Sequence, residues 1–399
     1  MPGPLTGFRI VDLTAVVAGP LATALLADQG ADVIKVERPS GDIQRHVGSA
    51  RGGMSGNFHV LNRGKRSISV DLKQARGREI VERLAAGADV LMQNFRPGVT
   101  DRLGLGWEAL SARNPRLVYV SMSGFGPDGP HARRRAYDPI IQARSGLVSA
   151  QGRARGETPE QINQLLCDKI TAYVASQAAT AALLARERSG AGQHVTVSML
   201  DSAIAFLWPD GGADSILLGD GVDHRPPIGA AGYLTAFRDG WATTMALSDA
   251  EFEGLCGALD MSEVASDPRF ASIAERQRHR DELRAILDTR AAARALELSL
   301  DEAEARFEAA HVPFGRVNRV EDLPGDPQVA ASGIFVESDH PIAGRVREAR
   351  PAPRFSSTPA QVGGAAPRIG EHTRQILAEI GLAAETDALL AARVVTEPA

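Results

Sequence analysis

Few residues of this chain could do chemistry on the strength of their type alone. Cys167 and Asp168 stand side by side at the start of an alanine-rich stretch, where a thiolate or a carboxylate could serve as a nucleophile. No Cys–His arrangement can be read from the sequence, so we expect Cys167 to be a small core residue. Aspartate is among the residues most favoured at a helix N-cap, and residue type alone assigns Asp168 to that structural role.

Metal and disulfide chemistry find no support in the residue spacing. The two cysteines, Cys167 and Cys256, are too few for a disulfide framework, and neither falls in a CxxC or CxxH pattern. None of the nine histidines has the HxxxH spacing of a metal site. We therefore expect two reduced thiols, no bound metal, and histidines at surface or capping positions.

The first turn of the chain has the layout of a dinucleotide site without its glycines. A buried strand is followed by a glycine turn and a helix, and Glu37 ends the next strand. Three glycines at fixed spacing would let a pyrophosphate approach the helix N-terminus, but this turn offers only Gly19, followed by Pro20. We expect neither nicotinamide nor flavin binding, and we interpret Glu37 as a solvated charge at a strand end.

Hydrophobic patterning predicts alternating strands and helices in the first half of the chain. Repeated β-α-β spacing of this kind indicates a parallel sheet with helices on both faces. The expected strands are residues 8–16, 32–36, 67–72, 89–94 and 116–122, and the expected helices are residues 21–29, 76–86 and 107–114. A long alanine-rich helix follows at residues 168–188, with helical spacing of Ile170, Val174, Ala178, Ala181 and Leu184.

Length and composition shifts predict two domains. A chain of 399 residues exceeds what one core usually organises. We expect a large Rossmann-like α/β domain over residues 1–210, a linker rich in Gly, Pro and Asp at 211–232, and a smaller, mostly helical domain at 233–323. Strand and turn signals at 333–336 and 344–347 and a helix near 373–381 predict that residues 324–399 return to the large domain.

Charge and hydropathy exclude several classes of partner. The formal net charge is −5, which argues against general attraction to a nucleic-acid backbone. The longest apolar stretch near the start, residues 15–27, is broken by Gly19 and Pro20 and is too short to span a bilayer. We expect a cytoplasmic protein that binds neither nucleic acid nor membranes.

Several short segments follow one another in order along nearly the whole chain. They are LTGFRIVD (5–12), AGP (18–20), GADVIKVE (30–37), NRGKRSISVDL (62–72), NFRPG (94–98), SGFG (123–126), YD (137–138), GQ (192–193) and GEHT (370–373). Together these segments resemble the family III CoA-transferases, a group that includes formyl-CoA transferase and carnitine CoA-transferase, with the methylacyl-CoA racemases as close relatives. The resemblance implies a Rossmann-like large domain built from both chain ends, a small domain, and an interlocked homodimer.

The resemblance also reverses the structural interpretation of Asp168. In the family, an aspartate just before a long helix attacks the thioester of an acyl-CoA, and Asp168 matches it. A mixed anhydride and then an aspartyl-CoA thioester would follow, and a small carboxylic acid would accept the CoA. Because one thioester replaces another, neither ATP nor a metal is needed. We expect the helix N-terminus to keep Asp168 ionised at neutral pH and nearby backbone N–H groups to stabilise developing oxyanions.

Coenzyme A contacts are also carried over from the family, residue by residue. A site for coenzyme A needs a few arginines to bind its phosphates and apolar surface to bind its adenine and pantetheine. The matching residues are Val16, Val17, Arg38, Leu72, Asn94, Phe95, Arg102, Arg135, Tyr137, Asp138 and Met199. Residues 229–232 (GAAG) only faintly resemble the glycine-rich loop that covers the site of formyl-CoA transferase, so the resemblance does not fix a gating loop or the acid substrates.

Two alternatives remain open from the sequence. A racemase or epimerase of the family exchanges the proton alpha to the thioester and has His where this chain has Tyr137, a far poorer base at neutral pH. Its supporting glutamate aligns loosely with Ser248. A catalytically silent member that only binds acyl-CoA is the other alternative, and the retained Asp168 counts against it.

Overall fold

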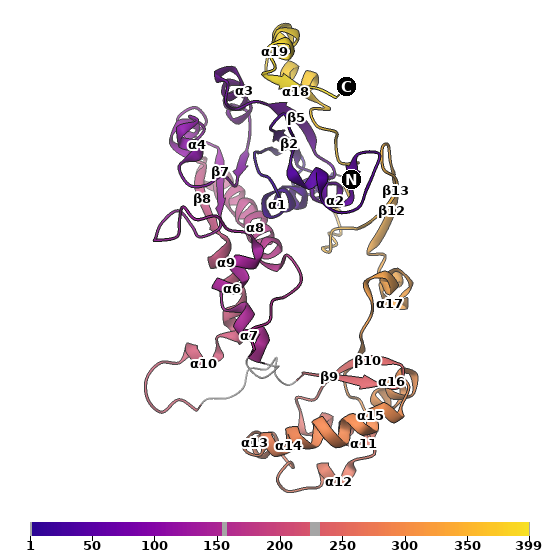
Figure 1. Ribbon diagram of the computed structural model, residues 1–399. Coiled ribbons are helices and arrows are strands. Elements are labelled where there is room, and N and C mark those ends of the chain that lie inside the picture. The colour runs from indigo at the N-terminus through magenta and orange to yellow at the C-terminus, as the bar shows by residue number, and fades with distance from the viewer. Residues whose placement is uncertain (1, 154–157, 224–231, 399) are drawn as a thin grey trace. The chain divides into compact units, whose positions relative to one another are not determined.

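A computed structural model provides the fold, and it describes residues 2–153, 158–223 and 232–398 (Figure 1). The chain divides into two compact units. One comprises Met1–Phe206 together with Pro327–Ala399, so both chain ends belong to it, and the other comprises Leu207–Asp326.

The first unit is built on a seven-stranded sheet with the strand order β14-β5-β2-β1-β6-β7-β8. All neighbouring strands are parallel except the β14–β5 pair, which is antiparallel. Strand order runs outward from β1 to one side and from β6 to the other, so the β1–β6 pair is a topological switch point. The strands are β1 (Arg9–Asp12), β2 (Asp32–Glu37), β5 (Arg66–Val70), β6 (Val90–Gln93), β7 (Val118–Ser123), β8 (Gln193–Ser198) and β14 (Val395–Thr396).

Alternating side chains along the strands divide the core of this unit into two layers. Val11, Leu91 and Tyr119 face one layer, and Ile10 and Val118 face the other. The first layer packs on α3 (Ala75–Ala86), α5 (Trp107–Ser111), α18 (Thr373–Glu379) and α19 (Thr386–Ala391). The second packs on α1 (Ala18–Ala27) and α8 (Leu166–Ser189), which lie together (Figure 1). The predicted parallel sheet with helices on both faces is confirmed.

The predicted apolar face of α8 is not the face that the structure buries. Ala172, Ala175 and Ala179 are fully buried, whereas Val174 is 38% and Leu184 is 57% exposed. The physical reason is the close contact between α1 and α8, which only small side chains permit, so the larger apolar residues of α8 point outward.

Further elements complete this unit around the sheet. They are the short strands β3 (Ala50–Arg51) and β4 (Met54–Ser55), the hairpin of β12 (Phe335–His340) and β13 (Gly344–Ala349), and the helices α2 (Gly56–Asn62), α4 (Val99–Arg102), α6 (Asp138–Arg144), α7 (Leu147–Arg153) and α17 (Pro327–Ser332). Helix α9 (Met199–Gly211) starts in this unit and ends in the other.

The second unit has its own core and a small antiparallel sheet, β11-β10-β9, that the sequence did not indicate. The strands are β9 (Gly232–Phe237), β10 (Gly240–Met245) and β11 (Phe314–Arg316). The stretch predicted to be helical forms α11 (Asp249–Ala258), α12 (Ser262–Ala265), α13 (Ile273–Arg278), α14 (Arg280–Ile286), α15 (Ala292–Glu297) and α16 (Leu300–Ala309), and α10 (Ala213–Ile216) precedes the sheet.

Three polar residues expected at the surface are buried. Glu37 is 4% exposed and forms an ion pair with Arg45, with 2.6 Å between Oε1 and Nη2. His59 and His340 are 4% and 3% exposed, and their rings meet edge to face. Both histidines have partners: His59 pairs with Glu348, and Nε2 of His340 lies 3.1 Å from the carbonyl oxygen of Ala366.

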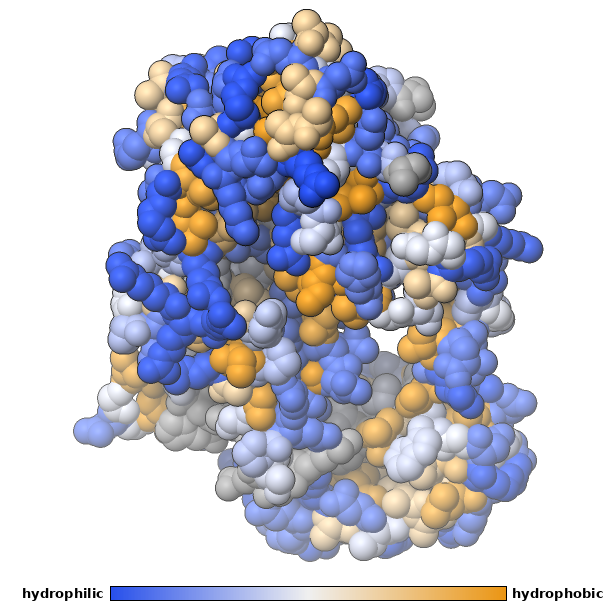
Figure 2. Space-filling view, turned by 45° about the horizontal axis from the view of Figure 1, so that its top comes forward, coloured by the Kyte–Doolittle hydropathy of each residue, from blue (hydrophilic) through white to orange (hydrophobic). Residues whose placement is uncertain are grey.

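The surface is otherwise that of an ordinary folded chain. The face drawn in Figure 2 is mostly hydrophilic, with apolar side chains in small groups. Within the described ranges, no helix is both long enough and apolar enough to cross a membrane.

Candidate active site

A small cavity lies where the loops after β1 and β6 meet. Because these strands are parallel neighbours at the switch point, the loops at their carboxyl ends lie side by side, as at the ligand sites of other open α/β sheets. The cavity encloses about 240 Å³. Its walls include these predicted site residues: Val16, Val17, Asn94, Phe95, Arg135, Tyr137, Asp168 and Met199.

Asp168 sits inside the first turn of α8 and is not a cap. The N-cap position is Leu165, and no side chain caps this helix. The backbone N–H of Ala18, the first residue of α1, instead acts on the Asp168 carboxylate and favours its charged form. The N-terminal ends of two helices therefore meet at this one carboxylate, and both favour negative charge there.

Burial opposes that effect and raises the pKa of Asp168 to about 7. The negative charge of Asp138 adds to the rise, and the Ala18 N–H partly offsets it. The expectation that the helix N-terminus keeps Asp168 fully ionised at neutral pH is therefore wrong, because desolvation is the larger influence. The carboxyl group is poised to change its charge near pH 7.

Asp138 fixes the start of α8. It is 1% exposed, and its Oδ2 accepts the backbone N–H of Asp168 at 2.8 Å. Its Oδ1 accepts Nε2 of Gln142 at 2.5 Å, and the same Nε2 donates to the carbonyl oxygen of Gln164 at 2.8 Å. The predicted site residue Asp138 thus touches the backbone of Asp168 and holds the segment that leads into the helix.

Asn94 joins the two loops that form the cavity floor. Its Oδ1 accepts the N–H of Ala15 at 2.9 Å, and its Nδ2 donates to the carbonyl of Ala15 at 2.7 Å. Gly19 lets the same turn fold tightly on itself, since a Cβ there would lie 2.3 Å from Cβ of Thr14. The lone glycine of this turn is therefore needed for close packing against Thr14.

Besides Asp138, which lies behind the cavity wall, three predicted residues do not line the cavity. Arg38 is exposed after β2 and donates to the carbonyl of Gly41 at 2.9 Å, Leu72 is half-buried against the core after β5, and Arg102 is exposed in α4. All three follow carboxyl ends of strands in the same sheet, so they share its edge with the cavity without lining it.

Two arginines of the cavity were missed from the sequence. Arg96 and Arg134 line it beside the predicted Arg135. Within the described part of the chain, none of the three has an ion-pair partner, so their charges are available to a ligand. Arg96 lies within the motif NFRPG, and Arg134 lies in a run of three arginines. The run was the available signal, but it could not tell which side chain faces inward.

Cys167 behaves as the core residue expected of it. It is fully buried, and burial together with the carboxylates of Asp138 and Asp168 raises the pKa of its thiol to about 12. A thiol with that pKa supplies almost no thiolate at neutral pH. Cys256 is also a free, buried cysteine, and no group of three described His, Cys, Asp or Glu side chains could hold a metal ion.

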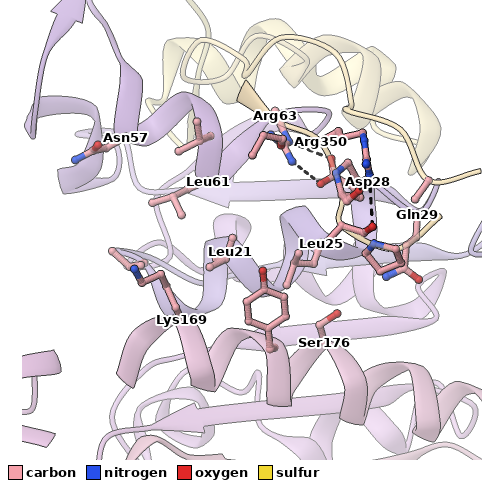
Figure 3. Close-up of a pocket in the computed structure, with 18 of the residues that line it drawn as sticks. Leu21, Leu25, Asp28, Gln29, Asn57, Leu61, Arg63, Lys169, Ser176 and Arg350 are labelled. Carbon is pink, nitrogen blue, oxygen red and sulfur yellow. Dashed lines mark hydrogen bonds and ion pairs between the residues drawn. The ribbon is translucent and has the colours of Figure 1, made fainter. Parts of the chain in front are cut away.

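A second, larger cavity of about 730 Å³ shares Val17 with the first (Figure 3). Leu21, Leu25 and Leu61 give it an apolar wall, and Lys169 and Ser176 line it from α8. Asp168 and Lys169, neighbours in the chain, thus face different cavities. This second cavity could not be anticipated from the sequence, because its walls combine α1 and α8 with residues of the C-terminal segment such as Arg350.

The chain matches the family model described as CoA-transferase family III over residues 5–373. It is 35% identical to the succinate–glutarate CoA-transferase of Agrobacterium fabrum, over 94% of this chain and 96% of the relative. It is 32% identical to a formyl-CoA:oxalate CoA-transferase of Escherichia coli, over 96% of both chains. A solved CaiB/BaiF family protein from Brucella suis superposes with a TM-score of 0.81 at 33% identity, covering 95% of this chain and all of that one.

The chain belongs to CoA-transferase family III. Its relatives carry the names of enzymes that transfer CoA, and transfer of CoA is the activity that family membership supports. The resemblance seen in the sequence is confirmed. Acyl-CoA is accordingly a substrate of this family III enzyme.

The structure also gives the positions of the two residues that the racemase alternative concerned. Ser248 is the N-cap of α11, where its hydroxyl accepts the N–H of Glu251 in a capping box. Tyr137 is 66% exposed at the cavity, directly before Asp138. Of the glycine-rich segment 229–232, residues 229–231 lie outside the described residues, and Gly232 begins β9.

Proposed function

We propose that this enzyme moves CoA between carboxylic acids through covalent intermediates on Asp168. A carboxylate oxygen of Asp168 attacks the thioester carbonyl of an acyl-CoA, the C–S bond breaks, and CoA leaves as the thiolate. The thiolate then attacks the aspartyl carbonyl of the mixed anhydride. The first acid leaves as its carboxylate, and an aspartyl-CoA thioester remains.

The second half of the reaction reverses the first with another acid. The acceptor carboxylate attacks the aspartyl carbonyl and releases the CoA thiolate, which forms a second mixed anhydride. Attack of the thiolate on the acceptor's carbonyl yields the new acyl-CoA and regenerates the Asp168 carboxylate. The overall exchange needs no outside energy source, because one thioester and one free carboxylate are consumed and one of each is formed.

One observation supports this assignment above the others: a carboxylate lines the switch-point cavity together with Ala18, whose N–H favours the charged form of that carboxylate. Asp138 and Gln142 hold the helix start through the backbone, so the nucleophile's position is set by groups that do not themselves react.

Intact-protein mass spectrometry after acid quenching tests this assignment. With a suitable acyl-CoA we expect an adduct of CoA less one water, mapped by peptide analysis to Asp168. An Asp301→Ala variant is the matched control, since Asp301 also lies in the first turn of a helix but is exposed in the second unit. Turnover without any adduct on Asp168, or an adduct on another residue, would falsify the proposed nucleophile.

The pH dependence of loading should follow the carboxyl group. Because the pKa of Asp168 is raised to about 7, the attacking carboxylate is scarce below that pH and dominant above it. Single-turnover loading should therefore rise with pH around a midpoint near 7. Asp138→Asn removes a negative charge that raises this pKa, so its midpoint should move to lower pH. Rapid-quench measurements from pH 5.5 to 8.5 would show the shift, and a flat profile would contradict it.

We propose a dicarboxylic acid as one of the two acids. The relatives are named for succinate, glutarate and oxalate, and each of these acids carries a second carboxylate. The unpaired arginines in the Asp168 cavity could bind that second group through charge-assisted hydrogen bonds. Other faces of the same arginines remain available to the phosphates of CoA.

Arg134→Met should raise the KM for a dicarboxylate acceptor by about tenfold or more, the value of one hydrogen bond to a charged group. The KM for the matching monomethyl ester should change much less. Arg133→Met is the control, because Arg133 is the exposed neighbour that does not line the cavity. Steady-state kinetics with the diacid and with its monomethyl ester measure the two KM values. An equal rise of both would exclude recognition of the second carboxylate by Arg134.

We further propose that two copies form the interlocked homodimer implied by the family, in the cytoplasm. The outward apolar side chains of α8 support this, since Tyr173 is 61% and Leu184 is 57% exposed. Apolar residues gathered on one helix face are typical of a contact surface.

A further inference from the structure

Four charged side chains are buried beneath the turn that joins β1 to α1. We call this turn, residues 13–20, the switch-point turn. Lys65 pairs with Asp12 at 3.0 Å, and both side chains are completely inaccessible to solvent. Lys35 pairs with Asp42 at 3.4 Å, and these side chains are 0% and 1% exposed. The cavity residues identified above include none of the four.

Each of these charges holds the backbone of the switch-point turn. Asp12 accepts the N–H and the hydroxyl of Thr14, and Nζ of Lys35 donates to the carbonyl of Thr14 at 3.1 Å. Nζ of Lys65 donates to the carbonyl of Pro20 at 2.9 Å. The turn is therefore fixed at both ends by buried charge.

Asp42 holds the middle of the turn at its most strained point. Val16 has φ +74°, a left-handed conformation that a β-branched residue rarely adopts. Such a conformation is strained and persists only where the surroundings impose it. Both carboxylate oxygens of Asp42 lie within reach of the Val16 N–H, at 3.2 and 3.3 Å.

The strained residue lies two positions before Ala18, and Val16, Ala18 and Asp168 line the same cavity. Val17 follows Val16, and the next N–H is that of Ala18, which favours the charged form of the Asp168 carboxylate. A rotation of the backbone at Val16 would redirect this N–H. The conformation that Asp42 imposes on Val16 therefore controls a group that touches the proposed nucleophile.

A buried ionic network is a poor means of stabilising a core, because desolvation of the charges offsets most of their attraction. Burial alone would raise the pKa of Asp12, yet Lys65 and Lys35 lower it to about 2, so this carboxylate stays charged. Apolar residues of similar volume would serve stability as well. Apolar residues could not form the directed hydrogen bonds to the turn that these charged side chains form.

We propose that Asp42, held in place by Lys35, is a positioning residue that keeps Val16 left-handed and thereby aims the Ala18 N–H at Asp168. This inference rests on the proposed role of Asp168 as the nucleophile. Asp42 itself does not touch the reacting atoms.

A double-mutant cycle between Asp42→Asn and Val16→Gly tests the proposal. Glycine adopts φ +74° without strain, so it needs less help from Asp42. Asp42→Asn alone should lower single-turnover loading by about tenfold, because small misplacements at a reacting group are costly. It should also raise the pH midpoint of loading, because a lost Ala18 hydrogen bond no longer lowers the Asp168 pKa. In the Val16→Gly background, the same substitution should change both quantities much less.

The pH midpoint separates positioning from mere stability, since a partly unfolded enzyme loads less without titrating differently. An unchanged midpoint in Asp42→Asn, or an equal shift in both backgrounds, would overturn the proposal. Asp267→Asn is the control, because Asp267 likewise accepts a backbone N–H but lies in the second unit.

Two further comparisons keep the outcomes distinct. If Asp42→Asn does not fold, Lys35→Met/Asp42→Leu replaces both charges and leaves no unpaired charge, and the same shift of the midpoint is expected of it. If the parent enzyme itself shows no loading of Asp168, the proposed function fails. If the parent loads normally and Asp42→Asn behaves like it, only the positioning role fails.

Discussion

Replacing Asp168 with alanine should abolish CoA exchange, with a fall in kcat of at least about ten-thousand-fold, the scale seen when a covalent nucleophile is removed. Asp168 is the only carboxylate among the described residues that line the cavity, and the nearby Asp138 cannot take over because it is buried and both of its oxygens accept hydrogen bonds. Exchange of labelled free acid into acyl-CoA measures the loss. Asp168→Asn should be equally inactive, since its amide keeps the acceptor for the Ala18 N–H but is not a nucleophile.

Binding of CoA provides the control for this prediction. Neither variant removes a group that we assign to CoA, and removal of a negative charge near a polyanionic ligand does not weaken binding. Calorimetric titration with CoA should therefore give a Kd close to that of the parent enzyme. Retained exchange in either variant would mean that the acyl group is transferred without an aspartyl intermediate.

The fold could be read from the sequence where burial and periodicity agree. Strands β1, β6 and β7 are buried on both faces, so they appear in the sequence as short apolar runs. The helical segments between such runs indicate a parallel sheet. Helix α8 shows where this reasoning fails. Two apolar faces follow the same helical spacing, and composition does not say that Ala175 and Ala179 face α1 while Val174 and Leu184 face outward.

The site could be anticipated only in part for a related reason. Loops at carboxyl ends of neighbouring parallel strands converge, so Val16 and Asn94 were reasonable candidates once the strand order was known. The strand order is known only from the structure, whereas the candidates Val16 and Asn94 and the role of Asp168 came with the family resemblance. Local sequence could not reveal the buried charges, since the partners of Lys65 and His59 lie 53 residues and nearly 300 residues away.

The ion pair between Asp28 and Arg63 is a buried contact whose loss should weaken the fold. Nε and Nη2 of Arg63 donate to the two oxygens of Asp28 at 3.1 and 2.7 Å, and the side chains are 10% and 2% exposed. The pair also reaches the returning C-terminal segment (Figure 3). Nη1 of Arg63 donates to the carbonyl of Ala349 at 2.9 Å, and the N–H of Gly363 points to Asp28 at 3.4 Å.

Asp28→Asn should therefore lower the free energy of unfolding by about 3 kcal/mol, because the buried guanidinium loses its two-fold partner and keeps only the longer contact with Glu348, at 3.9 Å. Urea denaturation measures the loss. Hydrogen exchange should show that the weakening begins in residues 349–363, which this pair fastens to α1 and to the loop before β5. Arg113→Met, which breaks an exposed ion pair, should change the unfolding midpoint little. Asp28→Leu/Arg63→Met should recover much of the lost stability, since it removes both charges together. If the single and double variants were equally unstable, packing volume rather than unpaired charge would be the cause.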